Sequence, residues 1–178
     1  MTATQSSSLL GSVLCFLLWG SVCHGAGAKL PGQAVTSPDG RWQVASQEPN
    51  EGVEFHRLVL IDQSTGSTTV FDRFSRHVDI LWSPDSERIA ITDYSGSSES
   101  DCRVARRSAD PSLSIRKAMR GTRFAKLADE NHHAYVTCKR WVDAAKLEFE
   151  MSAYGDANPK GVRTRGQLNA ATGEIIGR

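Results

Sequence analysis

The stretch "LWSPDSERIAITDY", residues 81–94, decides the fold. Apolar residues lie on both sides of the polar turn 83–86, and Ile89 and Ile91 alternate with other residues after it. Ser-Pro-Asp is typical of a β-turn, because Pro fixes φ at the second position and the Ser and Asp side chains bond the local backbone. Alternating apolar residues are typical of a β-strand. The stretch therefore predicts a strand, a tight turn and a second strand.

The same order of features occurs earlier in the chain. A turn "SPDG" begins at Ser37, 46 positions before Ser83, and strand-like segments follow it at 42–47 and 55–61. A repeat of this length is typical of β-propeller blades, which usually contain about four strands each. The first two segments are therefore interpreted as two copies of one structural unit.

A third segment near the C-terminus is a degenerate copy. The strand-like "HAYVTCKRW" leads into a turn near Asp143, and Trp141 with Asp143 repeats the pair Trp82 and Asp85 with one residue deleted. The hairpin turn "DQSTG" of the first segment also returns in form as "NAATG" in the third. The mature chain thus predicts the order strand, turn, strand, Asx-x-x-Thr-Gly turn, strand at both ends.

A short helical insert is predicted between the second and third segments. Pro111 follows Asp110, which is a helix-start signal, and apolar residues recur at helical spacing through residues 111–129. Gly121 interrupts the pattern. We expect one broken helix or two short ones, packed on the sheet.

These turns and strands resemble the blade repeats of TolB-type and WD-repeat-like propellers. The chain also resembles small exported bacterial proteins of unknown function, through the words "RHVDILWSPD", "TDYSGS" and "YGDANPKG". The resemblance implies a propeller-like fold and an export route, and it implies no activity.

The number of segments limits the architecture. Three segments supply about ten strands, whereas closed propellers have typically four to eight blades. The predicted fold is therefore mainly β, with about three antiparallel blade-like units that do not close a ring. Exposed strand edges need a cover, and we favour a monomer, covered by the helix and a disulfide, over an oligomer.

The first 28 residues predict a secretory signal peptide. They contain no Lys, Arg, Asp or Glu, and an apolar run from Leu9 to Val22 is too short for a comfortable membrane span. Ala26 and Ala28 are the small residues before a cut that would follow residue 28. An uncleaved anchor is the alternative, because the segment lacks the usual basic residue. Cleavage leaves 29–178 as a single domain, exported to the periplasm or secreted.

Two cysteines remain after this cut. In an exported protein Cys102 and Cys138 predict a disulfide, for which the chain-entropy model gives roughly 4 kcal/mol. Two buried free thiols are the alternative. Metal binding is less favoured, since there is no Cys-x-x-Cys pair.

No catalytic, metal or cofactor motif is recognised in the sequence. His132 and His133 are adjacent, so on a strand they would face opposite sides and could not easily chelate one metal. The serines lack the Gly-x-Ser-x-Gly elbow of hydrolases. We therefore expect neither an enzyme nor a cofactor, and the near-neutral charge of +1 gives no reason to expect nucleic acid.

Two polar loops and a basic stretch are the candidate interaction surface. The loop residues are Asp93, Tyr94, Glu99 and Asp101 in the first loop, and Tyr154, Asp156, Asn158 and Lys160 in the second. The basic stretch, residues 103–126, has eight cationic side chains and one acidic one. The expected function is a non-catalytic exported binding module of the bacterial envelope, whose partner is a protein or another envelope component. The alternative is a secreted inhibitor or immunity-type protein that blocks an enzyme with a surface loop.

The signal-peptide prediction can be tested by mass spectrometry of protein recovered from the export compartment. Because a signal peptidase cuts after small residues, the recovered chain should lack residues 1–28. An intact N-terminus would contradict cleavage and favour the anchor.

Overall fold

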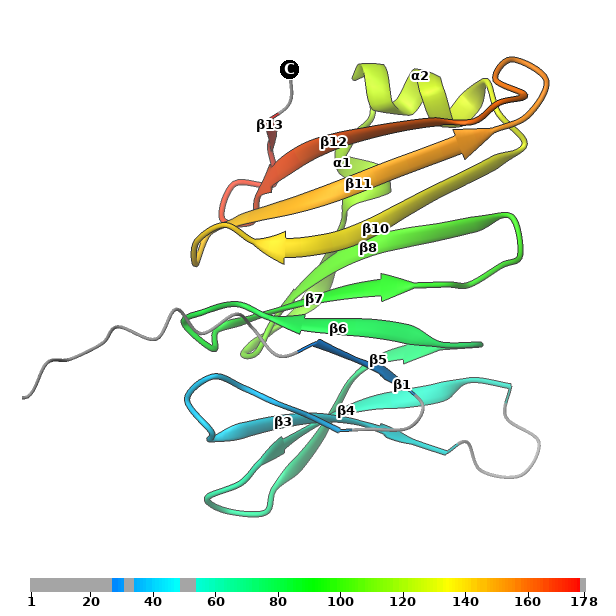
Figure 1. Ribbon diagram of the computed structural model, residues 1–178. Helices are drawn as coiled ribbons and strands as arrows, with labels where there is room; N and C mark the ends of the chain where they lie inside the picture. Colours follow the sequence, from blue (N-terminus) through cyan, green and yellow to red (C-terminus); the bar gives the residue numbers. More distant parts are fainter. Residues whose placement is uncertain (1–26, 31–33, 49–53, 177–178) are drawn as a thin grey trace, which may run out of the picture.

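Three antiparallel units of four strands follow one another along the chain in the computed structural model (Figure 1), which describes residues 27–30, 34–48 and 54–176. The first unit contains β2 (Val35–Thr36), β3 (Trp42–Gln47), β4 (His56–Asp62) and β5 (Thr68–Phe74). The second contains β6 (Val78–Trp82), β7 (Arg88–Asp93), β8 (Glu99–Arg106) and β9 (Ala109–Ser114). The third contains β10 (His133–Trp141), β11 (Lys146–Tyr154), β12 (Val162–Asn169) and β13 (Ile175–Ile176). The predicted mainly β fold with three blade-like units is confirmed.

The second and third units form one open sheet. A further strand, β1 (Gly27–Leu30), pairs antiparallel with β6, and β8 pairs with β10 in parallel, so that nine strands are connected. The first unit is a separate four-stranded sheet. Neither sheet closes on itself, as the sequence predicted.

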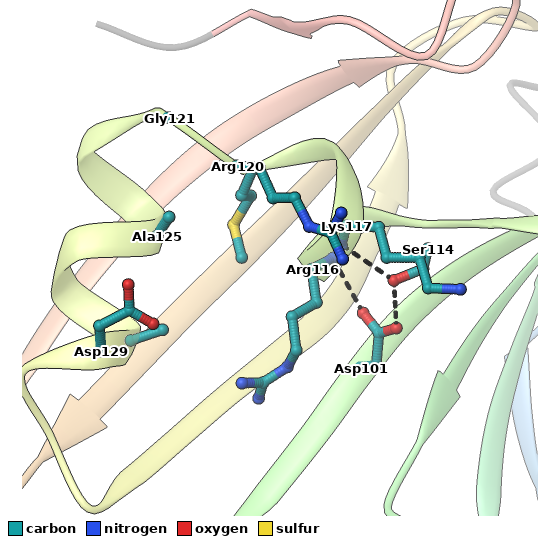
Figure 2. Close-up of a pocket in the computed structure, with 10 residues that line it drawn as sticks. Asp101, Ser114, Arg116, Lys117, Arg120, Gly121, Ala125 and Asp129 are labelled. Carbon is teal, nitrogen blue, oxygen red and sulfur yellow. Dashed lines mark hydrogen bonds between the residues drawn. The ribbon is translucent and has the colours of Figure 1, made fainter.

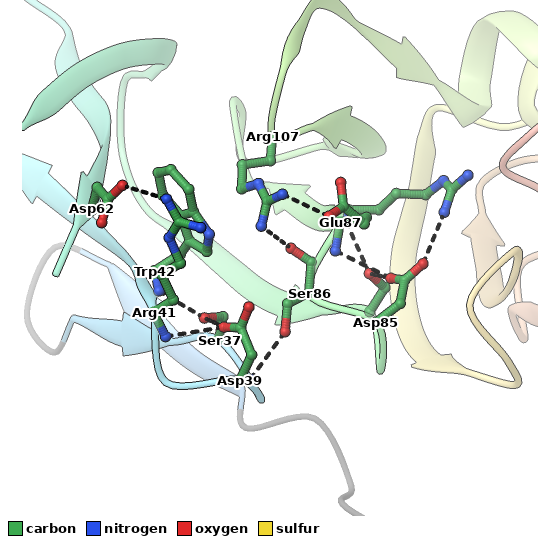
Figure 3. A network of polar contacts seen from close by, with 11 residues as sticks. Ser37, Asp39, Arg41, Trp42, Asp62, Asp85, Ser86, Glu87 and Arg107 are labelled. Atoms are coloured by element: carbon green, nitrogen blue, oxygen red, sulfur yellow. Dashed lines mark hydrogen bonds and ion pairs between the residues drawn. The ribbon is translucent and has the colours of Figure 1, made fainter. Parts of the chain in front are cut away.

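The repeat is exact at the level of hydrogen bonds in the first two turns (Figure 3). Ser37 Oγ donates to Asp39 and accepts from the backbone N–H of Trp42, and Ser83 makes the equivalent bonds with Asp85 and Arg88. Every partner lies 46 positions from its counterpart. The Ser and Asp side chains thus hold the chain reversal in both units, as local side-chain bonding predicts.

Ser86 takes the place of Gly40 in the second turn. Both have a left-handed backbone, with φ of 60° at Ser86 and 72° at Gly40. This conformation is uncommon for a residue with a side chain. The Ser86 hydroxyl accepts from the backbone N–H of Asp39 at 3.1 Å, so the first turn is bonded to the second.

The third turn follows the same plan with one residue fewer. Val142 N donates to Lys146 O across four positions, where Ser83 N donates to Arg88 O across five. Asp143 accepts from the backbone N–H groups of Ala145 and Lys146, each at 2.8 Å. One Asp side chain therefore does here what Ser and Asp do together in the other turns.

Two tryptophans tie consecutive units together. Trp82 Nε1 donates to Val35 O at 3.1 Å, and Trp141 Nε1 donates to Leu81 O at 3.2 Å. Val35 and Leu81 are themselves 46 positions apart. Each unit after the first thus bonds the same backbone position of the preceding unit.

Two hydrophobic cores lie on opposite faces of the second unit. Ile89 and Ile91 of β7 belong to a core shared with the first sheet, including Val44 and Leu58. Ala90, on the other face of β7, belongs to the core under the third unit and the helices. The first sheet therefore packs on one face of the second unit, and the core shared with the third unit and the helices lies on the other.

The parallel contact between β8 and β10, which we call the seam, is held by more than its short ladder of backbone pairs. Only Glu99 with Ala134 and Ser100 with Tyr135 are paired in this ladder. Further along, the Ser100 hydroxyl donates to Val136 O, and the disulfide between Cys102 and Cys138 joins the strands covalently. The predicted disulfide is confirmed, and it lies where the ladder ends.

The helical insert consists of α1 (Ile115–Ala118) and α2 (Arg123–Asp129), which confirms two short helices separated near Gly121. The start predicted at Pro111 is wrong, because that residue lies in β9. Ser114 caps α1 instead, accepting from Lys117 N, and Thr122 caps α2.

Most of the predicted signal peptide, 1–28, lies outside the described residues. Gly27 and Ala28 are described, and they pair with Leu81 and Ile80 through β1. A cut after residue 28 would leave Lys29 and the buried Leu30 in this strand.

The tryptophan ties are testable by substitution. Trp82→Phe removes the donor of the bond to Val35 O, so we expect the free energy of unfolding in urea to fall by at least about 0.5–1.5 kcal/mol, the net contribution of one hydrogen bond. Trp42→Phe is the control, because Trp42 Nε1 has no hydrogen-bond partner within the described part of the chain. Equal losses in the two variants would contradict the role of the tie.

Candidate functional site

The two predicted loops lie at the same end of the nine-stranded sheet (Figure 1). β7 ends at Asp93 and β8 begins at Glu99, while β10 begins at His133 and β11 ends at Tyr154. Because β8 and β10 run parallel, the connections 94–98 and 155–161 are brought to one edge. The tight turns lie at the opposite end.

Tyr135 connects the two loops. Its hydroxyl donates to Ser97 O at 2.7 Å and lies 3.5 Å from the hydroxyl of Tyr154. Tyr154 in turn stacks on His133, with ring centroids 4.2 Å apart. We call His133, Tyr135 and Tyr154 the tyrosine cluster. Tyr154 is 44% exposed, so the cluster presents an aromatic edge to solvent.

A shallow hollow of 370 Å³ adjoins the tyrosine cluster. Tyr135, Tyr154, Lys160 and Arg163 contribute side chains to its lining. The hydrogen bond with Tyr154, with a smaller effect of burial, raises the pKa of Tyr135. The hollow thus places two phenol hydroxyls beside two cationic side chains. Such a lining suits an anionic group.

The outer face of the third unit continues from this hollow as a charged surface. Strand register places Tyr135, Ser152 and Arg163 in one cross-strand row, and Thr137, Glu150 and Arg165 in the next. The charged face, as we call it, has four cations around two carboxylates. Its ion pairs are Lys139–Glu150, Arg140–Glu148, Arg163–Glu150, Arg165–Glu148 and Arg165–Glu150.

Two of the predicted loop residues, at the start of the first loop, make internal contacts. Asp93 accepts from Arg103 at 3.0 Å, and burial raises the pKa of its carboxyl group. Tyr94 donates to Asp79 at 2.9 Å and stacks on the His77 ring. These contacts fix the start of the first loop.

Asp101 holds the helical insert on the sheet (Figure 2). Its carboxylate accepts from Ser114 Oγ at 2.6 Å and from Arg116 N at 3.1 Å. The Arg116 guanidinium donates to Ser100 O and to Ala134 O, one from each strand of the seam. A 590 Å³ pocket beside them is lined by the exposed side chains of Lys117 and Arg120.

The remaining predicted loop residues are more open. Glu99 and Lys160 are exposed. Asp156 is exposed and lies 3.0 Å from His132 Nε2, while Asn158 donates to Asn131 Oδ1 at 3.3 Å. His132 and His133 thus have different partners, as expected for adjacent residues near a strand start. A role of these residues in binding stays a prediction.

The basic stretch is dispersed rather than gathered on one helix face. Arg103 pairs with Asp72 and Asp93, Arg107 pairs with Glu87, and Lys126 pairs with Glu130. The cations of the third unit, by contrast, share one sheet face. Arg163 and Arg165 were not among the predicted interaction residues, although their alternation in "RTR" opposite the alternating Glu148 and Glu150 was a usable signal.

The half-buried contact of Tyr94 with Asp79 predicts a measurable titration. Burial and the Asp79 carboxylate raise the pKa of Tyr94 to about 12. A raised pKa means that this phenol stabilises the fold below the unfolded value near 10, and that the contribution is lost as the pH rises toward 12. Subtracting the ultraviolet titration of Tyr94→Phe from that of the wild type should leave one phenol with a midpoint near pH 12. A midpoint near 10 would contradict the buried contact.

Comparisons with known proteins give a distant structural likeness. No protein-family model matches the chain, and no curated protein matches it. A solved structure from work on two prolyl endopeptidases is similar with a TM-score of 0.36 and 11% sequence identity, over 85% of this chain. This chain spans 29% of the length of that structure.

Among the residues that the structure describes, none of the helices has the length and apolar character needed to span a membrane.

Proposed function

We propose that this protein is a non-catalytic exported binding module of the bacterial envelope. The observation that carries the proposal is the convergence of both polar loops on the tyrosine cluster. Tyr135 bonds the first loop through Ser97 and meets Tyr154 at the start of the second. Aromatic side chains with a polar tip are typical of binding surfaces, because they contribute large contact area and can form hydrogen bonds.

The chemistry of the hollow favours a ligand with an anionic group. Lys160 and Arg163 line it beside the Tyr154 phenol, and its lining contains no carboxylate. The Tyr135 hydroxyl keeps its proton in the bond to Ser97 O. A carboxylate or phosphate entering there would accept charge-assisted hydrogen bonds, which are stronger than neutral ones. An acidic partner protein fits this pattern better than a basic one.

The covalent seam supports the exported location. Disulfides persist in oxidising compartments such as the periplasm, and Cys102 and Cys138 are bonded in this fold. The same bond holds β8, which follows the first loop, against β10, which carries His133 and Tyr135 of the tyrosine cluster. Export would therefore allow the disulfide to form, and the disulfide stabilises the strands that support the proposed binding site.

A pull-down from envelope extract tests the function. Protein purified from the export compartment should retain a partner, and Tyr154→Ala with Lys160→Glu should lose it, because the variant removes an exposed ring and reverses a charge in the hollow. Val142→Ala is the matched control, since Val142 is similarly exposed, at 43%, but lies in a turn at the opposite end of the strands.

The outcomes separate the proposed function from its alternative. Several envelope components retained by the wild type and the control, and lost by the double variant, would support the binding module. A single enzyme retained in a stoichiometric complex and inhibited by it would support an inhibitor instead. Equal recovery by all three proteins would contradict the proposed site.

A further inference from the structure

The strand β12 has an open edge over half its length. β13 pairs only with Gln167 and Leu168 of this strand. Residues 162–166 form backbone hydrogen bonds with β11 alone, within the part of the chain that the structure describes. This open half lies beside the hollow, since Val162 and Arg163 belong to both.

The hydrogen-bond pattern identifies which backbone groups face the open edge. Ala170 N donates to Ala145 O, toward β11, and Asn169 N donates to Glu174 O, on the other side. Successive residues of a strand direct their backbone groups to opposite sides, and the register with β11 has no shift. Counting back from these two residues, the N–H and C=O groups of Arg163 and Arg165 point to the open edge.

The side chains of the same two residues define the charge of this edge. Those of Arg163 and Arg165 are 73% and 62% exposed, and both point to the charged face, toward Glu150. The face carries two more cations than carboxylates. A second copy of this strand would bring like charges together, and charged edge strands of this kind resist self-pairing.

We propose that an extended, acidic peptide segment of the partner adds to the open half of β12 as a further strand. Its backbone would bond the free N–H and C=O groups of Arg163 and Arg165, as in other cases of strand addition. Alternate acidic side chains would lie on the charged face beside the two guanidinium groups. This strand addition rests on the proposed binding function, and it specifies the class of ligand and the strand to which the ligand binds.

The direct test measures amide hydrogen exchange by NMR on the full exported chain. The probe is a blocked hexapeptide of alternating Val and Glu. With the probe bound, exchange at the Arg163 and Arg165 amides should slow by about tenfold, because both become hydrogen-bonded. Amides of β5, the edge strand of the first sheet, should be unchanged.

Two control peptides and two variants sharpen the result. Replacing Glu by Lys in the probe, or a central Val by Pro, should abolish binding, because the first reverses the charge and the second prevents strand pairing. Arg163→Gln with Arg165→Gln should weaken binding by about tenfold. Arg120→Gln with Lys126→Gln, which removes two exposed cations from the helical insert, should leave binding within about twofold.

The outcomes distinguish this inference from the proposed function. Binding of the Lys peptide as strongly as the Glu peptide, or unchanged exchange at Arg163 and Arg165, would overturn strand addition. If the partner is still lost from Tyr154→Ala with Lys160→Glu in the pull-down, the binding function stands without this docking mode. If Tyr154→Ala with Lys160→Glu retains the partner while the probe protects the Arg163 and Arg165 amides, the acidic segment binds β12 and the hollow does not contribute to binding.

Discussion

The hydrogen bond from a tryptophan indole to the preceding unit is the constraint on which the arrangement depends. Trp82 reaches Val35 O, and Trp141 reaches Leu81 O, at equivalent positions of the repeat. An indole N–H left without a partner in the interior costs free energy, so each indole favours one distance and one tilt between neighbouring units. The turn contacts reinforce this geometry, because Asp39 bonds Ser86.

The charged face is suited to contact with water rather than to packing against another unit. A fourth unit packed there would have to take Glu148, Glu150 and their cationic partners out of water, and burying such ion pairs costs more than their attraction returns unless the geometry is excellent. The inner face of the same strands is apolar and is covered by the helices, with Phe124 against Phe149. The third unit therefore has one face for the core and one for water.

Sequence reasoning succeeded where the determining contacts are local. The Ser-Pro-Asp turns bond their own neighbours within five positions, and the Asx-x-x-Thr-Gly turns have Gly66 and Gly173 in the left-handed conformation that they require. It failed where the determining contacts are distant. Pro111 has a helix-start pattern, but pairing of the flanking residues with β8 places it in a strand. The role of Tyr135 depends on the parallel seam, which no local pattern predicts.

The two ends of the strands therefore differ in what their residues are free to do. At the turn end, side chains stabilise the chain reversals and connect neighbouring units. Arg88 donates to Ala144 O in the third turn, and Arg107 lies over the Trp42 ring. At the loop end, contacts such as that of Tyr94 with Asp79 fix the base of each loop, while Tyr154 and Lys160 stay open to solvent. Rigid support beneath exposed polar and aromatic groups is what binding surfaces require. A ligand that meets the loop end would find its contacts already positioned, and would lose little free energy in ordering them.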